Sequence, residues 1–216
     1  MAQTNVDPVP RAEPVRAQRA TELIEAGRQF YARGWLPATS GNLSARISTD
    51  RIAITVSGTH KGDLDAEGIM VVDLDGEAVG STARPSAETA LHTALYRRDP
   101  AIGAVLHIHS LNATVLSRVF GDALPLRDYE ILKAFAGVDT HATELKVPIF
   151  PNDQDIPRLA RRIEEHMTAS GPLHGYLIAG HGLYAWGRSV AEARRHVEAL
   201  EFLFDCEMNL YRMGRI

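Results

Sequence analysis

Apolar positions recur along the chain at two different spacings. Over residues 20–31 and again over 190–211 they return every three or four residues, a period that predicts amphipathic helices. Over 52–58, 69–76 and 103–110 they form short runs rich in β-branched residues, which predict strands that enter a core. Helical and strand periods alternate without internal repeats, so the pattern predicts one α/β domain.

Turn-forming residues and helix caps mark the remaining elements. Ser189 with Glu192 fits a capping box at the start of the last helix, and Asp155 with Pro157 fits the start of another. Glycine, proline, serine and asparagine predict a loop over 34–46. The other predictions are helices over 85–100, from Ser110 onward and over 128–136, strands over 146–150 and 175–179, a tight turn over 180–182 and a paired strand over 183–187.

Together these elements predict a single domain of three layers over residues 20–216. The pattern does not determine the order of the strands. Residues 1–19 hold prolines and charges without apolar periodicity, so they predict a flexible N-terminal arm. The same stretch has no apolar core, and we do not expect it to act as a signal peptide.

Composition narrows the class of protein. The chain has 216 residues, 45% of them hydrophobic, which is enough for a sizeable core. Its formal net charge is −4 and it has no basic patch, so we expect no nucleic-acid partner. No apolar stretch reaches the roughly 18 residues of a membrane span, so we expect no membrane partner. The single cysteine, Cys206, cannot form an internal disulfide, which predicts a reducing compartment such as the cytoplasm.

Two histidines, His107 and His109, stand one residue apart in the apolar stretch GAVLHIHS. On a strand, side chains alternate between the two faces, so both imidazoles point to one side and Ile108 points to the other. Ring nitrogens of two histidines on the same face of a strand, one residue apart, can converge on one metal ion. The alternative is a pair of hydrogen-bonded core histidines.

A third candidate ligand, His181, lies between two glycines in the stretch GHGLYAWG. Glycines allow a sharp turn that brings one side chain to a defined point. With the pair in GAVLHIHS, this histidine outlines a three-histidine site that leaves a position open, as catalytic rather than structural sites do. Zinc is the first choice of metal, and iron, cobalt, nickel or copper also accept imidazole. An ordinary loop histidine is the alternative.

Three polar loops offer groups that suit a phosphate. They lie in ATSGNLSAR, in VSGTHKGDL and in RPSAET, the last at a predicted helix start. Hydroxyls, amides and free main-chain N–H groups bind phosphate, and a helix N-terminus adds a favourable potential. Each loop alone is equally an ordinary turn. The candidate residues are Thr39, Gly41, Asn42, Ser57, Gly58, Lys61 and Ser86.

Two carboxylates are candidates for proton transfer. Glu88 follows Ser86 in the first turn of a predicted helix, where it either serves the site or only favours the helix dipole. Glu130 lies in the mostly apolar stretch YEILKAFAG, where a carboxyl with a raised pKa is suited to acid or base catalysis. A solvent-facing position is the alternative for Glu130.

With these residues assembled, the chain resembles the class II aldolase/adducin-head family from about residue 20 to 212. The stretches that carry the resemblance are GWLPATSGNLSAR, VSGTHKG, RPSAET, HIHS, YEILKAFAG, PNDQDI and GHGLYAWG. HIHS and GHG are shared by the metal-dependent members. PNDQDI, GHGLYAWG and Glu130 in its segment discriminate better and point to the dehydratases of the family.

The resemblance implies an α/β/α fold around a central, largely antiparallel sheet, a homotetramer, and one Zn²⁺ per subunit held by His107, His109 and His181. It implies a small phosphorylated, sugar-like substrate bound by the three polar loops. In the aldolases the glutamate matching Glu88 is a metal ligand and proton carrier, and in the dehydratases the one matching Glu130 is the acid/base. This chain has both, so Glu88 is also a candidate fourth ligand. Ala87 stands where the aldolases often carry a second serine.

Two alternatives stay open at the level of sequence. The same site suits retro-aldol cleavage or epimerisation of a sugar phosphate, because both reactions begin with a polarised carbonyl. The domain also resembles a non-catalytic interaction module of the adducin-head type, which keeps the fold without the metal site. The presence of all three histidines favours an enzyme.

Overall fold

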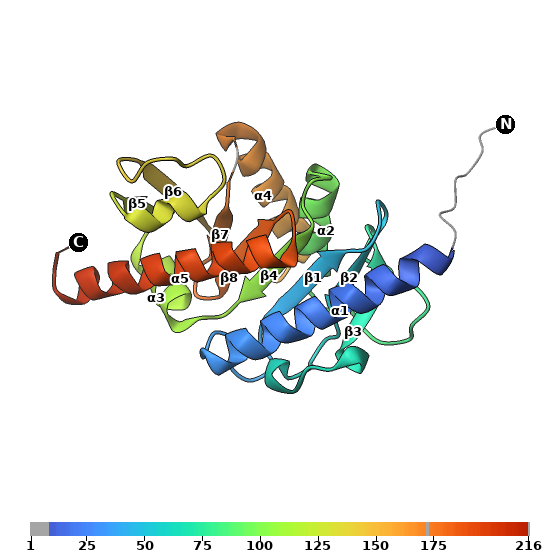
Figure 1. The fold of residues 1–216 in the computed structure, drawn as a ribbon. Helices are drawn as coiled ribbons and strands as arrows, with labels where there is room; N and C mark the ends of the chain where they lie inside the picture. Colours follow the sequence, from blue (N-terminus) through green and yellow to red (C-terminus); the bar gives the residue numbers. More distant parts are fainter. Residues whose placement is uncertain (1–8, 172, 216) are drawn as a thin grey trace.

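A computed structural model describes residues 9–171 and 173–215 of the protein (Figure 1). Its α-helices are α1 (Val9–Ala32), α2 (Thr89–Arg98), α3 (Leu111–Val119), α4 (Ile156–Ser170) and α5 (Val190–Arg212). Its strands are β1 (Asn42–Arg46), β2 (Arg51–Thr55), β3 (Ile69–Asp73), β4 (Ala104–Ile108), β5 (Ala123–Arg127), β6 (Glu144–Phe150), β7 (Gly175–Ile178) and β8 (Gly182–Gly187). Three short 3₁₀ helices are η1 (Lys61–Asp63), η2 (Ala66–Gly68) and η3 (Glu130–Ala134).

The strands of the described chain form one sheet in the order β3-β2-β1-β4-β8-β7-β6-β5. The pairs are antiparallel except for β6 and β7, which run parallel. The expectation of a largely antiparallel sheet is therefore confirmed. Strand β4 lies between β1 and β8, so one strand joins the N-terminal and C-terminal parts of the chain.

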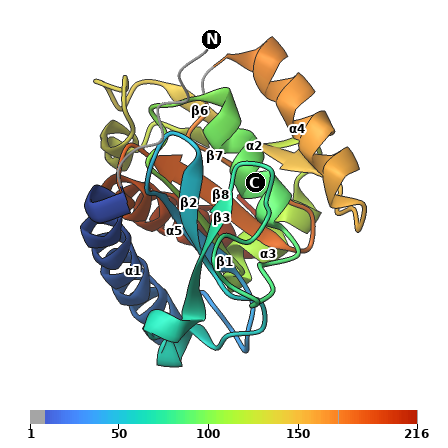
Figure 2. The ribbon, with the colours of Figure 1, turned by 90° about the vertical axis from the view of Figure 1, so that its right-hand side faces the viewer.

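Helices cover both faces of this sheet, which confirms the three-layer prediction (Figure 2). Helices α1, α3 and α5 pack on one face through side chains such as Leu23, Leu116 and Leu200. Helices α2 and α4 pack on the other through side chains such as Leu91 and Leu159. Apolar burial on both faces explains why the strand segments read as nearly continuous hydrophobic runs.

Strand β4 shows how alternation distributes its side chains. Leu106 and Ile108 point into the core under α1, α3 and α5. Val105 points toward α2 and α4, and so does His107, which stacks on Tyr184 of that same face. A histidine thus stands in a fully buried and otherwise apolar strand. It needs polar partners there, because burying an unpaired polar group is unfavourable.

The prediction of a loop over 34–46 is wrong for its second half, because residues 42–46 form β1 in the interior of the sheet. Leu43 and Ala45 enter the core under α1. Asn42 and Ser44 point to the opposite face, where both are buried. Asn42 is hydrogen-bonded to Ser86, just before α2, and Ser44 to His92 of α2. Polar residues at the buried positions made this strand read as a loop.

Two helix predictions differ from the structure in extent. The helix expected over 128–136 is only the five-residue 3₁₀ helix η3, which ends at Ala134. Asp128, two residues before it, has a left-handed conformation. The helix expected from about residue 20 begins at Val9, inside the predicted arm, and residues 1–8 lie outside the described part. Within the described ranges no helix has the length and apolar character needed to cross a bilayer.

Helix caps follow the sequence signals. Asp155 accepts a hydrogen bond from the Arg158 N–H at the start of α4, and Ser110 caps α3 through the Ala113 N–H. At α5, Ser189 accepts from the Glu192 N–H, whereas the Glu192 carboxylate accepts from the Arg188 N–H rather than from Ser189. One of the two hydrogen bonds of the capping box is therefore formed as predicted, whereas the return bond to the Glu192 side chain comes from the residue before the cap.

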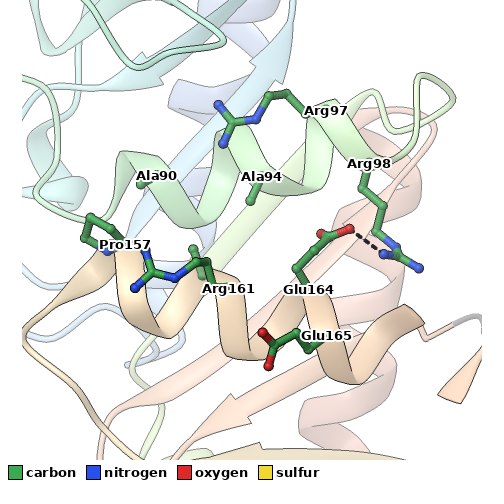
Figure 3. Close-up of a pocket in the computed structure, with 9 residues that line it drawn as sticks. Ala90, Ala94, Arg97, Arg98, Pro157, Arg161, Glu164 and Glu165 are labelled. Carbon is green, nitrogen blue, oxygen red and sulfur yellow. Dashed lines mark hydrogen bonds and ion pairs between the residues drawn. The ribbon is translucent and has the colours of Figure 1, made fainter. Parts of the chain in front are cut away.

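A surface groove of about 600 Å³ separates α2 from α4 (Figure 3). Ala90, Ala94 and Pro157 form part of its wall, and the side chain of Arg98 pairs with Glu164 at 2.6 Å across it. None of the residues predicted for the functional site lines this groove. It is the seam between two helices of one layer.

A buried carboxyl on α5 makes the stability of the fold depend on pH. Glu201 accepts a 2.6 Å hydrogen bond from Ser110, the residue that caps α3. Burial raises the pKa of Glu201 to about 7, although the Ser110 hydroxyl opposes this. The folded protein therefore holds the proton more tightly than the unfolded chain, and Glu201 lowers the stability as pH rises from about 4.5 to 7.

We predict that Glu201→Gln stabilises the protein at high pH but not at low pH. Glutamine keeps an acceptor for Ser110 and cannot ionise. The pKa difference corresponds to a gain on the order of 3 kcal/mol above pH 7, which vanishes below pH 4.5. Urea unfolding of both proteins at pH 4.5 and pH 8 measures it. An equal difference at the two pH values contradicts the assignment.

Candidate metal centre

Four potential metal ligands from distant parts of the chain meet near one end of the central strands β4 and β8. His107 lies near the end of β4 and His109 directly follows the strand. His181 lies in the turn between β7 and β8, and Glu88 is the residue before α2. One ligand atom from each lies within 4.8 Å of all the others. The structure thus brings together all three predicted histidines and one of the two predicted carboxylates.

The three imidazoles face one another through their Nε2 atoms. These atoms lie 2.8 Å apart between His107 and His109, 3.1 Å between His109 and His181, and 3.3 Å between His107 and His181. The Nδ1 atom of His107 lies 2.9 Å from the carbonyl oxygen of Leu183, so it carries the proton and leaves the Nε2 lone pair free. Hydrogen bonds cannot satisfy three such nitrogens together, whereas one cation can.

Burial keeps His107 and His109 in the neutral form that binds metal. It lowers the pKa of His107 well below its ordinary value, against the opposing charge of Glu88. It also lowers the pKa of His109 to about 4, and the facing His181 adds to the effect. Three imidazole nitrogens and one carboxylate form a donor set that fits a divalent metal.

Glycines on both sides of His181 set the turn that presents it. Gly180 has a φ of +65°, a conformation that disfavours side chains. At Gly182 a Cβ atom would lie 2.1 Å from the carbonyl oxygen of Ile108. The two glycines therefore let the chain reverse sharply and lie directly against β4, where His107 stands.

Glu88 is ionised and held by several donors. Its Oε1 lies 3.0 Å from Nε2 of His181, and its Oε2 accepts hydrogen bonds from Asn42 at 2.8 Å and from the hydroxyl of Tyr184 at 3.0 Å. Burial acts to raise the pKa of Glu88, but His107, His181 and Asn42 outweigh it and hold the pKa below its ordinary value. The carboxylate is available as a ligand or as a proton acceptor.

A pocket of about 420 Å³ opens over this cluster. All seven residues predicted to bind phosphate line it, together with Glu88, His109 and His181. The three polar loops, separate in sequence, therefore surround one cavity. The seven are Thr39, Gly41, Asn42, Ser57, Gly58, Lys61 and Ser86.

Lys61 brings a positive charge to the wall of this pocket. Its side chain is buried, and its Nζ donates to the carbonyl oxygens of Thr39 at 3.0 Å and Thr59 at 2.7 Å. Burial lowers the pKa of Lys61 to about 8, which leaves most of the amine charged near neutral pH. A buried ammonium next to hydroxyl groups suits an anionic group of a ligand.

Comparison with known proteins identifies the family. The family model described as class II aldolase and adducin N-terminal domain matches residues 21–208. The chain belongs to this family. It is 60% identical to the methylthioribulose-1-phosphate dehydratase of Methylococcus capsulatus over 91% of this chain and 96% of that protein. It is 55% identical to the enzyme of the same name from Pseudomonas aeruginosa over 93% and 98% of the two chains.

Solved structures agree with the class II aldolase assignment. An L-fuculose 1-phosphate aldolase matches with a TM-score of 0.76 and 26% identity, and the match covers 91% of this chain and 88% of that one. The predicted fold class and family resemblance are therefore confirmed.

Glu130, the other predicted carboxylate, does not line the pocket of its own chain. It stands at the start of η3, its side chain is 74% exposed, and its Oε1 accepts from Nζ of Lys133 at 2.6 Å. This hydrogen bond and the charge of Lys133 lower the pKa of Glu130, so the expectation of a raised pKa is wrong. The short η3 leaves Glu130 in solvent while Leu132 enters the core.

Sequence analysis missed several groups that lie in or behind the pocket. The ring of Tyr184 stacks on that of His107 with centroids 3.9 Å apart, and its hydroxyl reaches Glu88. Tyr184 pairs with His107 across β4 and β8, and the sequence pattern did not determine that these two strands are neighbours. Asn152, Asp153 and Gln154 line the pocket after β6; the stretch PNDQDI carried the resemblance without suggesting a role.

We predict that Gly182→Ala removes metal binding. A Cβ atom there meets the main chain of Ile108, which cannot move aside without separating β8 from β4. Overpacking of this kind destabilises by about 1–3 kcal/mol and shifts His181. Metal content after dialysis against zinc and thermal unfolding measure both effects. Gly121→Ala, whose Cβ meets nothing within 4 Å, is the control; wild-type metal content in Gly182→Ala contradicts the prediction.

Proposed function

We propose that the protein is a methylthioribulose-1-phosphate dehydratase that acts with one Zn²⁺ per subunit. The observation that carries this proposal is the three-histidine and glutamate cluster in a pocket surrounded by the phosphate-type loops. The relatives at 55–60% identity support the choice of substrate. The reaction removes water from 5-methylthioribulose 1-phosphate and yields 2,3-diketo-5-methylthiopentyl 1-phosphate.

The donor set supports zinc as the metal. Three imidazoles with an open position are typical of catalytic zinc. His107, His109 and His181 would hold the ion, with Glu88 as a fourth ligand that substrate displaces. When bound, the metal supplies Lewis-acid polarisation of the substrate carbonyl, which makes the neighbouring C3–H group acidic.

The strand order suggests how the substrate lies. Ser57 and Gly58 follow β2, Asn42 begins β1, and the histidines lie at β4 and the β7–β8 turn. The pocket therefore runs across the ends of these neighbouring strands. We place the phosphate between the loops of Thr39, Ser57 and Ser86, with the charge of Lys61 beside it. Carbons 2 and 3 then lie near the metal ligands. This arrangement orients C3 toward Glu88.

The dehydration needs one base and one acid. The C3 proton passes to a carboxylate, the C3–H electron pair forms an enol, and the C4 hydroxyl leaves as water after it receives a proton. Glu88 is the ionised carboxylate that the pocket itself offers for the first transfer. Ketonisation of the enol gives the diketone, so atoms and charge balance.

We assign the acid for the C4 hydroxyl to Glu130 of a second copy of the chain. Glu130 is exposed and lies outside the pocket of its own subunit, so an oligomer must bring it to a neighbouring pocket. The homotetramer expected from the family resemblance offers such an arrangement.

We place this enzyme in the cytoplasm, where the single Cys206 stays reduced.

We predict metal-dependent formation of the diketone from 5-methylthioribulose 1-phosphate, read by its ultraviolet absorbance. Chelator abolishes the activity and zinc restores it. His109→Ala binds no metal, turns over at least 100-fold more slowly and stays folded, because His109 is a ligand rather than a packing residue. His166→Ala, on α4 outside the cluster, is the control.

Two other results decide against the proposal. Cleavage of L-fuculose 1-phosphate to two fragments, without diketone from the first substrate, identifies an aldolase. Pure protein that contains no transition metal and gains none from added zinc identifies a non-catalytic module.

We also predict that two inactive variants complement each other. His109→Ala lacks a ligand but keeps Glu130, whereas Glu130→Gln keeps the metal ligands. Mixed oligomers contain some pockets with an intact ligand set and the partner's Glu130, so refolding the two variants together restores part of the wild-type rate. Glu165→Gln, an exposed change on α4, keeps the rate. Absence of any recovery, with mixed oligomers verified, assigns Glu130 to its own subunit or to no role.

A further inference from the structure

A line of polar side chains runs from Glu88 into the core between β1 and α2. Asn42 and Ser44 come from β1, and His92 and Tyr96 come from successive turns of α2. His92 and Ser44 are fully buried, and Asn42 and Tyr96 are nearly so. Ser44, His92 and Tyr96 have no part in binding metal or phosphate, yet they occupy buried positions in the middle of the domain, where apolar residues are usual.

Each polar group along this line has a partner. His92 Nε2 contacts Asn42 Oδ1, and His92 Nδ1 lies 2.7 Å from the Ser44 hydroxyl, which in turn lies 2.9 Å from the Tyr96 hydroxyl. At the other end, Asn42 Nδ2 donates to Glu88 Oε2 at 2.8 Å and to Ser86 Oγ at 3.0 Å. Satisfied buried networks of this kind hold their members in one orientation.

The charge of Glu88 determines the direction of these hydrogen bonds. An ionised carboxylate only accepts, so the NH₂ group of Asn42 must face Glu88 and its carbonyl oxygen must face inward. That oxygen then needs a donor, and the group in contact with it is the Nε2–H of His92. His92 is neutral, since burial lowers its pKa to about 4 against the opposing charge of Glu88. Its Nδ1 therefore accepts from Ser44.

We propose that His92 is a positioning residue that holds the Asn42 amide with its NH₂ group toward Glu88 and Ser86. Through Asn42 it orients the carboxylate of the metal centre and a hydroxyl of the phosphate loop at the same time. His92 touches neither metal nor substrate. The assignment deepens the proposed function and rests on it for the catalytic consequence, but its effect on metal binding stands without a known substrate.

A packing role alone does not account for His92. Another buried histidine, His196 on α5, donates only to the carbonyl oxygen of Trp186, and its Nε2 has no partner among the described residues. His92, in contrast, uses both ring nitrogens, and each meets a polar side chain of β1. The contact that matters for the site is the one at Nε2, because it is the one that reaches Asn42.

Two substitutions separate the contacts of His92. His92→Gln carries a donor near the position of Nε2 and can still reach Asn42. His92→Asn is shorter, can meet Ser44 near the position of Nδ1 and cannot reach Asn42. His196→Asn makes the same change at a buried histidine outside the site. The dissociation constant for Zn²⁺ is measured by chelator competition, alongside unfolding of the metal-free proteins and kcat/KM.

We expect His92→Asn to bind Zn²⁺ about 10–100-fold more weakly than wild type, the range typical when a partner of a metal ligand is lost. Its kcat/KM falls in step. His92→Gln and His196→Asn stay within about threefold of wild type in zinc affinity, even where their unfolding temperatures fall as far as that of His92→Asn. The proposal is overturned if the loss of zinc affinity among the variants parallels the fall in their unfolding temperatures, whether or not they keep the contact to Asn42. Wild-type zinc affinity in His92→Asn overturns it as well.

If His92→Asn does not fold, Asn42→Ala takes its place, because it removes the link itself; zinc affinity equal to wild type then overturns the proposal. A wild-type protein that binds zinc but does not dehydrate the substrate refutes the proposed function alone. In that case the zinc affinities of the same variants still decide the role of His92.

Discussion

The antiparallel pairing of β4 with β8 is the interaction on which the site depends. It places His107 opposite Tyr184 and Ile108 opposite Leu183. The close approach at Gly182 brings the turn that carries His181 against the end of β4, and the Leu183 carbonyl oxygen selects the tautomer of His107. His107 and His181, 74 residues apart in sequence, thus become neighbours. The close approach is possible because Gly182 has no side chain that would meet the main chain of β4.

The second constraint is the need to satisfy polar groups that the sheet buries. His107, Asn42 and Ser44 all point from central strands into the layer under α2 and α4. In an apolar layer each of them costs stability unless it is paired. The protein pairs them with each other, with α2 and with Glu88. The same contacts that remove the cost also orient the groups that face the pocket.

The two sides of the sheet therefore differ in what they contribute. The layer of α1, α3 and α5 forms a largely apolar core, although it also contains the buried carboxyl of Glu201. The layer of α2 and α4 supplies Glu88, His92 and the pocket wall near Asp153 and Leu159. A site at the ends of central strands gains from this division, since β4 holds His107 rigidly and loops complete the pocket.

Much of this could be predicted from the sequence, because local periodicity reports burial directly. The alternation in GAVLHIHS identified two histidines on one face, the glycines around His181 identified a turn, and serine and aspartate identified helix starts at Ser110 and Asp155. Resemblance to a known family supplied the antiparallel character of the sheet and the grouping of the phosphate loops. Where buried residues were polar, as in β1, the hydrophobic pattern indicated a loop instead of a strand.

By itself the sequence determined the helices and most of the strands, and which residue types were available as ligands. Only the tertiary structure decided that Glu88 stands beside the histidines, that Tyr184 covers His107, that His92 reaches Asn42 and that Glu130 remains outside the pocket of its own chain. The physical reason is that local patterns record whether a residue is buried, whereas partners across a sheet are set by strand order and register, which depend on long-range packing.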